Sequence, residues 1–298
     1  RWGNQQGGSL WVRNVLNGWL ARRADKWLQQ QQATSIICTH ATPAGIVSAW
    51  KKRYKKSIPL YGVITDYVIH SWWLYAEVDG YFVANEQLQA GLARRLAANQ
   101  QVYASGIPIR AGFYQPEERA AFRQAQGIAP DAFVCLLMGG GNGLLPMETL
   151  VAQCRMLPKT HVVAITGSNE ALYRRLAQRR PANVTVLGAV QDVWNWMQCA
   201  DVLVSKAGGV TAAEATALGL PLVFYRPLPG QEIGNVRFLE AAGLAVRAET
   251  IEALLAALSR LAPATATRQR QKSERIPAAR QIVITILGEN NDSSAQKS

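Results

Sequence analysis

Residues Asp201–Glu214, DVLVSKAGGVTAAE, decide the fold class of this chain. An apolar run predicts a short strand, the small residues after Ser205 predict a turn, and the alanine-rich segment from Gly209 predicts the start of a helix. Glycines in such a turn let backbone N–H groups approach a ligand closely. Because the N-terminus of the following helix carries partial positive charge, this stretch predicts a site for a diphosphate.

Glu214 lies one turn into this predicted helix, where its two carboxylate oxygens could accept both hydroxyls of a ribose. The spacing from Thr211 to Glu214 is also that of a capping box, in which the carboxylate accepts a hydrogen bond from the backbone at the start of the helix. The residues alone leave the ribose role and the capping role open.

Short apolar runs alternate with helical patterns along most of the chain, which predicts parallel sheets covered by helices. A change of composition over residues 110–130 indicates a linker. It divides the chain into an N-terminal domain (1–125), a second domain (130–270) and a C-terminal helix with a frayed tail (271–298). The predicted strands are residues 35–38, 60–64, 80–84, 133–138, 162–166, 184–187, 202–205 and 222–225.

The composition is that of a globular, basic protein. Its net charge of +12, from 32 Lys and Arg against 20 Asp and Glu, predicts affinity for an anionic surface or a phosphorylated substrate. The four cysteines are widely separated, with no histidines at the spacing of a zinc site, so we expect buried thiols in a reducing compartment. No apolar run reaches the roughly 20 residues that cross a bilayer, so any membrane contact is expected to be peripheral.

Two further loops follow predicted strands and carry polar or glycine-rich sequence. The run Gly139–Gly143 (GGGNG) favours a phosphate or sugar site, with a merely flexible turn as the alternative, and it matches neither GxxxxGK[ST] nor GxGxxG. The segment Tyr225–Asn235 (YRPLPGQEIGN) has amide and carboxylate side chains that suit sugar hydroxyls, or that cap an ordinary turn and helix. Ligands of open α/β sheets bind at the edge where both loops are expected.

Several motifs occur in an order that resembles one family. In the second half these are 136–143 (LLMGGGNG), 165–168 (ITGS), 205–209 (SKAGG), 219–221 (GLP) and 229–232 (PGQE); in the first half they are 65–73 (TDYVIHSWW), 78–81 (VDGY) and 106–110 (GIPIR). Over about residues 11–287 the chain resembles the monogalactosyldiacylglycerol synthase and processive diacylglycerol glucosyltransferase family, which is related to the lipid II N-acetylglucosaminyltransferase.

The resemblance implies an α/β fold of GT-B architecture, with two Rossmann-like domains facing a central cleft. It implies an inverting transfer of a hexose from a UDP-sugar, with Glu214 on the ribose and Glu232 with Gln231 on the sugar. No DxD metal motif occurs, so we expect no metal and no cofactor, and backbone amides with Lys206 to stabilise the diphosphate. The donor-binding residues expected are Gly139, Gly140, Gly141, Gly143, Thr166, Gly167, Ser205, Lys206, Ala207, Gly208, Gly209, Thr211, Glu214, Gln231, Glu232 and Asn235.

The family opens with a strand and a glycine-rich loop whose histidine is the general base, and no segment of this sequence matches them. The sequence begins at Arg1, and we expect an opening strand, loop and helix to be missing from it or never encoded, so that the N-terminal domain is incomplete. A neutral imidazole suits the removal of a proton from an acceptor hydroxyl. His40 and His70 are the candidates within this sequence, although a lone histidine near a strand end is more often structural.

The first half also carries the features of a membrane-binding surface. Trp11, Trp19 and their apolar neighbours recur at helical spacing beside arginines, which indicates either an interfacial amphipathic helix or a helix packed on its own sheet. Lys51, Lys52 and Arg53 belong to a basic patch that suits an anionic leaflet, a solvated loop or a nucleic acid. Trp72 and Trp73 could line an acceptor groove or fill the core, and the resemblance favours the groove for at least one.

The resulting expectation is a peripheral enzyme on the cytoplasmic, inner face of the cell membrane that transfers a hexose from a UDP-hexose to diacylglycerol. The alternatives are transfer to a polyprenyl-linked sugar, and an inactive fragment that binds nucleotide sugar and membrane. Nucleic-acid binding ranks behind these because no fold signature for it accompanies the charge. No obligate protein partner is expected.

Overall fold

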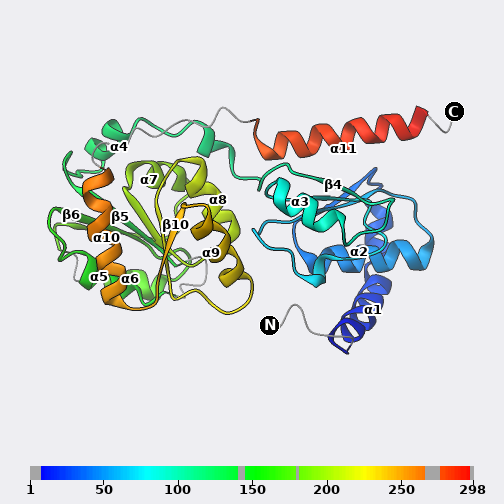
Figure 1. Cartoon of the computed structure of the whole chain (residues 1–298), viewed down its shortest axis with the longest axis horizontal. Coiled ribbons are helices and arrows are strands. Elements are labelled where there is room, and N and C mark those ends of the chain that lie inside the picture. Colours follow the sequence, from blue (N-terminus) through cyan, green and yellow to red (C-terminus); the bar gives the residue numbers. More distant parts are fainter. Residues whose placement is uncertain (1–7, 140–144, 179–180, 266–275, 296–298) are drawn as a thin grey trace. The chain divides into compact units, whose positions relative to one another are not determined.

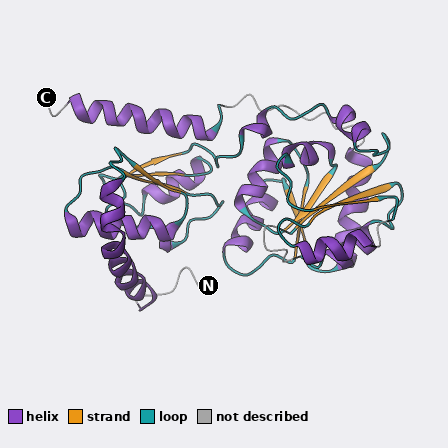
Figure 2. Ribbon diagram, turned by 180° about the vertical axis from the view of Figure 1, so that it is seen from behind, coloured by secondary structure: helices purple, strands orange, loops and turns teal. Residues whose placement is uncertain are grey.

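The computed structural model describes residues 8–139, 145–178, 181–265 and 276–295, and the chain forms two compact units. Unit 1 comprises Arg1–Pro108 together with Ile276–Ser298, and unit 2 comprises Ile109–Arg275. Each unit has a parallel β-sheet with helices packed against it (Figure 1 and Figure 2). The predicted α/β class is therefore confirmed.

Unit 1 is built on a sheet of four parallel strands in the order β1-β2-β3-β4. Its core contains the buried side chains of Leu60, Tyr81 and Val83 from the sheet, together with Ala44 and Trp50 of α2. Its elements are α1 (Gly8–Gln30), β1 (Ile36–Cys38), α2 (Ala41–Tyr54), β2 (Leu60–Val63), η1 (Ser71–Trp73), β3 (Gly80–Phe82), α3 (Glu86–Ala93), β4 (Gln101–Tyr103) and α11 (Ala278–Ala295).

The helix α11 returns to unit 1 from the far end of the chain (Figure 1). Its buried residues Ile282 and Ile286 form one apolar cluster with Tyr61, Val63 and Phe82 of β2 and β3. Unit 1 is therefore discontinuous in sequence. The predicted C-terminal helix is present as α11, which lies within the expected segment 271–298.

Unit 2 has a sheet of six parallel strands in the order β10-β9-β8-β5-β6-β7. The chain starts at β5 in the middle, builds outward to β7, and then returns to β8 on the other side of β5. This reversal is a topological switch point, where the loops after β5 and β8 diverge and open sheets bind their ligands. The elements are η2 (Ala111–Tyr114), α4 (Arg119–Ala125), β5 (Phe133–Met138), α5 (Met147–Cys154), β6 (Thr160–Ile165), α6 (Glu170–Gln178), β7 (Val184–Leu187), α7 (Val193–Cys199), β8 (Val202–Ser205), α8 (Gly209–Ala217), β9 (Leu222–Tyr225), α9 (Gln231–Ala241), β10 (Ala245–Ala248) and α10 (Ile251–Thr265).

Helices cover both faces of this sheet, so its strands are apolar on both sides. Cys135 and Leu137 of β5 share a buried cluster with residues of α5, α6 and α10, such as Leu150, Leu172 and Leu254. Figure 1 shows α7, α8 and α9 on the other side of the sheet. The continuous apolar runs of the sequence follow from this two-sided burial.

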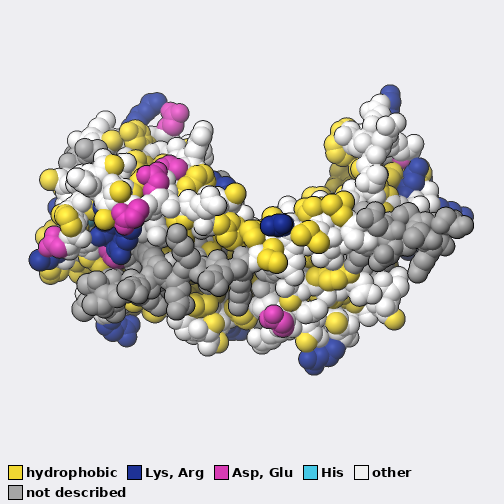
Figure 3. All heavy atoms as spheres, turned by 90° about the horizontal axis from the view of Figure 1, so that it is seen from above, with side chains coloured by type: hydrophobic (Ala, Val, Ile, Leu, Met, Phe, Trp, Pro, Cys, Tyr) yellow, Lys and Arg dark blue, Asp and Glu magenta, His cyan; other side chains and the backbone are white. Residues whose placement is uncertain are grey.

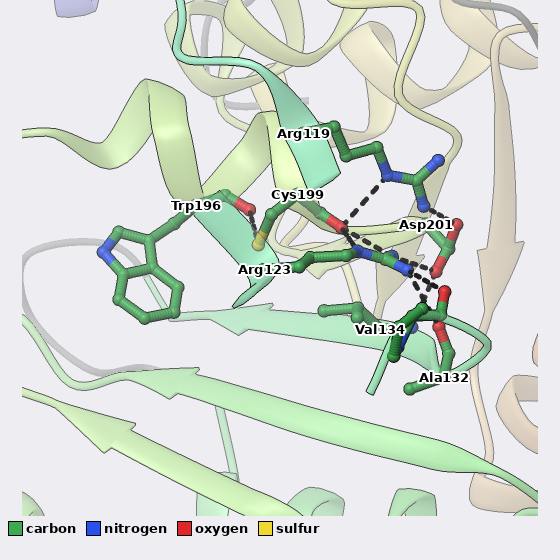
Figure 4. A network of polar contacts seen from close by, with 8 residues as sticks. Arg119, Arg123, Ala132, Val134, Trp196, Cys199 and Asp201 are labelled. Carbon is green, nitrogen blue, oxygen red and sulfur yellow. Dashed lines mark hydrogen bonds and ion pairs between the residues drawn. The ribbon is translucent and has the colours of Figure 1, made fainter. Parts of the chain in front are cut away.

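A buried polar network ties α4 to unit 2 (Figure 4). Arg119 and Arg123 of α4 both form ion pairs with Asp201 at the start of β8, and Arg123 also donates to the Cys199 carbonyl at 2.7 Å. Asp201 accepts a hydrogen bond from the Val134 N–H at 2.7 Å. The unit boundary therefore falls at residues 108/109, before the segment 110–130 that the composition marks as a linker.

The predicted strands 133–138, 184–187, 202–205 and 222–225 coincide with β5, β7, β8 and β9. Two edge strands, β4 and β10, were not predicted. Only Val102 of β4 is buried, and β10 has the sequence AVRA, so neither presents an apolar run. All four cysteines are free and buried, as predicted.

Candidate functional site

The turn after β8 lies at the switch point of unit 2. The Ser205 hydroxyl donates to the Met138 carbonyl at 2.9 Å and joins the ends of β8 and β5. Gly208 caps α8, and no side chain accepts a hydrogen bond from the first turn of the helix at this cap. The turn therefore presents backbone N–H groups and the positive end of α8 to an anion.

Asn235 forms a hydrogen bond to the backbone of this turn. It is buried on α9, and its amide nitrogen donates to the Ala207 carbonyl at 2.9 Å. A contact between Asn235 and the donor sugar stays a prediction. The hydrogen bond to Ala207 ties α9 to the turn after β8, next to the predicted site.

Lys206 and Glu232 face each other across the switch-point edge, with Nζ and Oε1 separated by 3.8 Å. The other carboxylate oxygen of Glu232 accepts from the Leu228 N–H at 2.9 Å, which holds the Pro/Gly loop in place. Gly230 has φ 107°, a backbone conformation that suits glycine, and it caps the helix that begins with the exposed Gln231. The structure thus brings Lys206, Gln231 and Glu232 to the same edge as the turn.

Glu214 has a buried carboxylate, with 8% of its side chain exposed, and it lies 3.6 Å from Arg110 Nη2. Burial raises the pKa of Glu214, and the Arg110 guanidinium opposes that rise. The capping box is absent, since Gly208 rather than Thr211 is the cap residue of α8. Of the two roles left open by the sequence, the capping role is therefore excluded.

The predicted residues after β5 and β6 are only partly described. Thr166 is buried and donates its hydroxyl to the Leu187 carbonyl at 3.1 Å, so it is engaged within the sheet, and Gly167 turns the chain at φ 61°. Gly139 is buried at the end of β5. The predicted contacts of Gly140, Gly141 and Gly143 lie outside the described residues.

In unit 1, two histidines and a carboxylate lie at the carboxyl ends of the strands. His40 follows β1, and its Nδ1 accepts a hydrogen bond from the Thr42 N–H at 3.2 Å, which caps α2. Burial lowers the pKa of His70, which the charge of Asp66 raises and that of His40 lowers. The imidazole of His70 is therefore neutral near pH 7. It lies close enough to Asp66 and His40 for their charges to affect its pKa.

Two of the predicted acceptor and membrane residues, Trp73 and Lys51, are buried rather than exposed. Trp72 is 39% exposed, but Trp73 is 3% exposed and belongs to the core of unit 1, so the groove role is wrong for Trp73. Lys51 is also buried, and its Nζ forms an ion pair with Asp79 at 2.6 Å. It is therefore not available to a membrane, whereas Lys52 and Arg53 are exposed.

The helix α1 packs on α2 and leaves an apolar face exposed. The exposed residues are Trp11, Val12, Val15, Leu16, Trp19 and Trp27. Beside it lies a groove of about 910 Å³ whose lining includes Arg13, Arg22, Lys52 and Arg53. In the described part of the chain no carboxylate pairs with Arg22 or Lys52. On the face drawn in Figure 3, Lys and Arg side chains are spread over the surface rather than gathered in one patch.

Sequence reasoning missed two features of these sites. Arg110 was quoted only within a motif, yet it is the ionic partner of Glu214. The groove between α1 and α2 was not predicted, although its cations were visible as separate basic residues. Neither the Arg110–Glu214 ion pair nor the groove can be recognised from a short stretch of sequence, because the residues that meet in each are far apart in the chain.

Within the described residues, no group of histidine, cysteine and carboxylate side chains is arranged to hold a metal ion. The helices described are all too short or too polar to span a bilayer.

Two family descriptions match successive parts of the chain. Residues 4–109 match monogalactosyldiacylglycerol (MGDG) synthase, and residues 146–263 match glycosyl transferases group 1. The chain is 28% identical over 279 residues to the processive diacylglycerol beta-glucosyltransferase of Bacillus pumilus, covering 91% of this chain and 72% of the relative. It is 30% identical over 257 residues to the Bacillus subtilis protein of the same name, covering 84% of this chain and 66% of the relative.

Solved structures share the fold at low sequence identity. MurG of Acinetobacter baumannii has a TM-score of 0.61 at 17% identity, over 96% of this chain and 82% of that one. UGT89C1 of Arabidopsis thaliana, complexed with UDP-L-rhamnose, has a TM-score of 0.61 at 12% identity, over 85% and 70%. The GT-B fold expected from the motifs is confirmed by these similarities.

Proposed function

This chain is a glycosyltransferase of the monogalactosyldiacylglycerol synthase and processive diacylglycerol glucosyltransferase family, and on that premise we propose that it transfers a hexose from a UDP-sugar to diacylglycerol at a membrane surface. The transfer proceeds with inversion: the acceptor hydroxyl attacks the anomeric carbon, the bond to the diphosphate breaks, and UDP leaves. The acceptor hydroxyl loses its proton to a base.

The observation that carries the donor assignment is the buried Glu214 carboxylate behind the turn between β8 and α8. The start of α8, where the cap residue Gly208 offers no side-chain hydrogen bond, suits the two phosphates, and the carboxylate suits the ribose hydroxyls one helical turn further on. Lys206 and Glu232 flank the same edge and supply a cation for the leaving diphosphate and acceptors for sugar hydroxyls. A protein of similar fold is complexed with UDP-L-rhamnose, which supports a UDP-linked donor.

His70 is the candidate base among the described residues. Its imidazole is neutral near pH 7 because burial lowers its pKa, so it has a lone pair with which to accept a proton. Asp66 lies near enough to stabilise the imidazolium that would form. His40 is the weaker candidate, since its Nδ1 already accepts the hydrogen bond that caps α2.

The membrane assignment is carried by α1. Its exposed tryptophans supply the amphipathic rings that favour a lipid–water interface, and the adjacent groove supplies cations for anionic headgroups. Each cation near an anionic leaflet contributes about 1 kcal/mol. We further propose that the protein is a peripheral enzyme on the inner face of the cell membrane, with the exposed tryptophans and the cations of the groove against the lipid.

The test is to mix the protein with anionic liposomes that contain diacylglycerol and with labelled UDP-glucose or UDP-galactose, and to extract the lipids for label. Glu214→Gln keeps the shape of the side chain but loses the charge, so we expect about tenfold weaker UDP binding by calorimetry and less label at limiting donor. Arg174→Ala, which removes an exposed arginine of α6, is the matched control.

Label in the lipid fraction that depends on diacylglycerol supports the proposal. UDP binding without transfer to diacylglycerol overturns the acceptor assignment. That outcome favours a polyprenyl-linked acceptor, or a protein that binds nucleotide sugar and membrane without catalysis. Equal UDP binding by the wild type and Glu214→Gln overturns the ribose assignment.

A further inference from the structure

Arg13 lies on the face of α1 that packs against the rest of unit 1. Its Nη1 donates to the Ser71 carbonyl at 3.1 Å, and its guanidinium carbon lies 4.4 Å from the centroid of the Tyr75 ring. Asn17, which is buried one helical turn further on, donates its amide to the Tyr75 hydroxyl at 3.3 Å. The docked face of α1 therefore holds the segment that directly follows His70.

The same segment is also held from the sheet. The hydroxyl of Tyr81 on β3 donates to the Trp73 carbonyl at 2.8 Å and accepts from the Tyr75 N–H at 3.1 Å. A Cβ at Gly45 of α2 would lie 2.3 Å from the Tyr75 hydroxyl oxygen, so this ring lies directly against α2. The segment after His70 is thus fixed between α1 and the core of the unit.

The backbone on both sides of His70 is held by arginines. The Arg13 bond to the carbonyl of the following residue is matched by Arg95, whose Nη1 donates to the Ile69 carbonyl at 3.5 Å. His70 itself is the cap residue of η1, and its side chain makes no capping hydrogen bond. The orientation of the imidazole therefore depends on how firmly these backbone contacts are held.

The opposite face of α1 carries the exposed side chains of Trp11 and Trp19, which the proposed function places at a lipid surface. Arg13 and Asn17 lie between these residues in the sequence but belong to the docked face. Because a helix moves as a rigid element, a shift of its outer face at a lipid surface also moves its docked face. The helix is therefore able to carry such a shift to the His70 segment.

We infer that Arg13 is a positioning residue that ties the His70 segment to α1, so that contact of α1 with a lipid surface is transmitted to the candidate base. The inference rests on the proposed roles of α1 and His70 and adds the link between them. Arg13 acts through the backbone at Ser71 and not on the substrate. The candidate base is then aligned when α1 lies on the surface that holds the lipid acceptor.

The pKa of His70 reports on this positioning. Burial lowers it, the charge of Asp66 raises it and that of His40 lowers it, while Arg13 and Arg95 contact the neighbouring carbonyls. Loss of the Arg13 contact loosens the segment and admits water to the imidazole, so the pKa should rise toward its ordinary value. Because a base must be neutral to accept a proton, the acid limb of the pH–rate profile should move to higher pH.

The first experiment measures this pKa by NMR on protein labelled with carbon-13 histidine, without lipid or donor. The chain has 3 histidines, and His40→Gln and His161→Gln assign their resonances. Arg13→Met, which keeps an apolar stem against Tyr75 but removes the donor, should raise the pKa of His70 by roughly half to one unit, the scale of one lost hydrogen bond. The pKa of His161 in unit 2 should not change.

Two further variants separate the bond from the charge. Arg13→Lys keeps the charge and one donor group, so the rise should be smaller. Lys26→Ala removes an exposed cation from the same helix and is the matched control, so the pKa of His70 should equal that of the wild type. An unchanged pKa in Arg13→Met, or an equal rise in Lys26→Ala, overturns the inference.

The second experiment adds bicelles that contain phosphatidylglycerol. The His70 resonance of the wild type should shift, and Arg13→Met should lose most of that response while it still sediments with vesicles of the same lipid. An equal response in both proteins, no response in the wild type, or loss of vesicle binding by Arg13→Met overturns the inference.

These results are distinguishable from failure of the proposed function. A wild type that does not bind the vesicles removes the membrane role of α1, and the inference falls with it. Absence of sugar transfer with the NMR responses intact removes the proposed reaction alone, because neither NMR measurement needs turnover.

Discussion

Asp201 is the residue on which the start of unit 2 depends. Its carboxylate accepts a hydrogen bond from the backbone of β5 and forms ion pairs with two arginines of α4, one of which is buried (Figure 4). The residue lies at the beginning of β8, at the opposite end of the strand from Ser205 and the predicted diphosphate site. It therefore contributes to stability without touching the candidate site.

We expect Asp201→Asn to lower the free energy of unfolding by about 3–5 kcal/mol, because the change leaves the buried Arg123 without its counter-charge. Urea denaturation followed by circular dichroism measures this. Asp131→Asn removes a carboxylate from an exposed pair with Lys159 and should change stability little. If the two variants unfold at the same urea concentration, the network does not hold α4 in place.

At this scale the sequence predicts residue types better than it predicts partners. The turn at Ser205–Gly209 and the acid at Glu214 were found from spacing alone, because both lie within one strand–helix connection. In the run of lysines around residue 51, nothing local shows that Lys51 is the buried one. Its partner Asp79 precedes a different strand, and only the folded sheet brings the two together.

Among the elements, the contact between α1 and α2 determines how α1 lies on unit 1. Gly45 of α2 meets α1 so closely that a Cβ there would be 2.3 Å from both the Asn17 amide nitrogen and the Tyr75 hydroxyl oxygen. Gly18 of α1, by contrast, has no other atom within 4 Å of its hypothetical Cβ. Replacing each glycine by alanine is therefore expected to change the stability of the protein in opposite directions.

Gly45→Ala is expected to destabilise the protein by about 1–3 kcal/mol, because α1 must shift to admit the methyl group. Gly18→Ala is expected to stabilise it by up to about 1 kcal/mol, since alanine is the better helix former and nothing obstructs it. Urea midpoints of the two variants provide the comparison. A Gly45→Ala protein at least as stable as the wild type would show that the helices are not in close contact.

Sequence reasoning located most accurately the strands with the most apolar sequence. β5, β8 and β9 are inner strands of unit 2 with almost continuous apolar runs, and β7, although it is an edge strand, still has three apolar residues out of four. β4 and β10 pair along only one edge, and their short sequences contain too few apolar residues to be distinguished from loops. The helix α1 was found from its spacing, but the groove beside it depends on packing that the sequence does not encode locally.

For the whole molecule, the main feature is that unit 1 is discontinuous in sequence. The chain leaves unit 1 at residue 108 and returns to it at residue 276, after unit 2. The returning helix α11 contributes Ile282 and Ile286 to a cluster on β2 and β3 and leaves Val283 and Ile284 exposed. The sequence predicted the helix but not the unit to which it belongs, since its partners on β2 and β3 lie about 200 residues earlier in the chain.

Ile282→Ala should lower the free energy of unfolding by about 2–5 kcal/mol, as is usual for large-to-small changes in a core. Ile284→Ala, on the same helix, should stay within about 0.5 kcal/mol of the wild type. Thermal or urea unfolding distinguishes them. Equal effects of the two changes would mean that α11 is not docked through the face that carries Ile282.

The same discontinuity bears on the order in which a ribosome can complete the protein. During synthesis the strands β2 and β3 leave the exit tunnel long before α11 does. Tyr61, Val63 and Phe82 therefore lack their contacts with α11 while all of unit 2 is translated. At about 5–20 residues per second, that interval is on the order of ten seconds or more. Until α11 emerges, this apolar sheet surface has no cover from that helix, and unit 2 is the first unit whose whole sequence is available for folding.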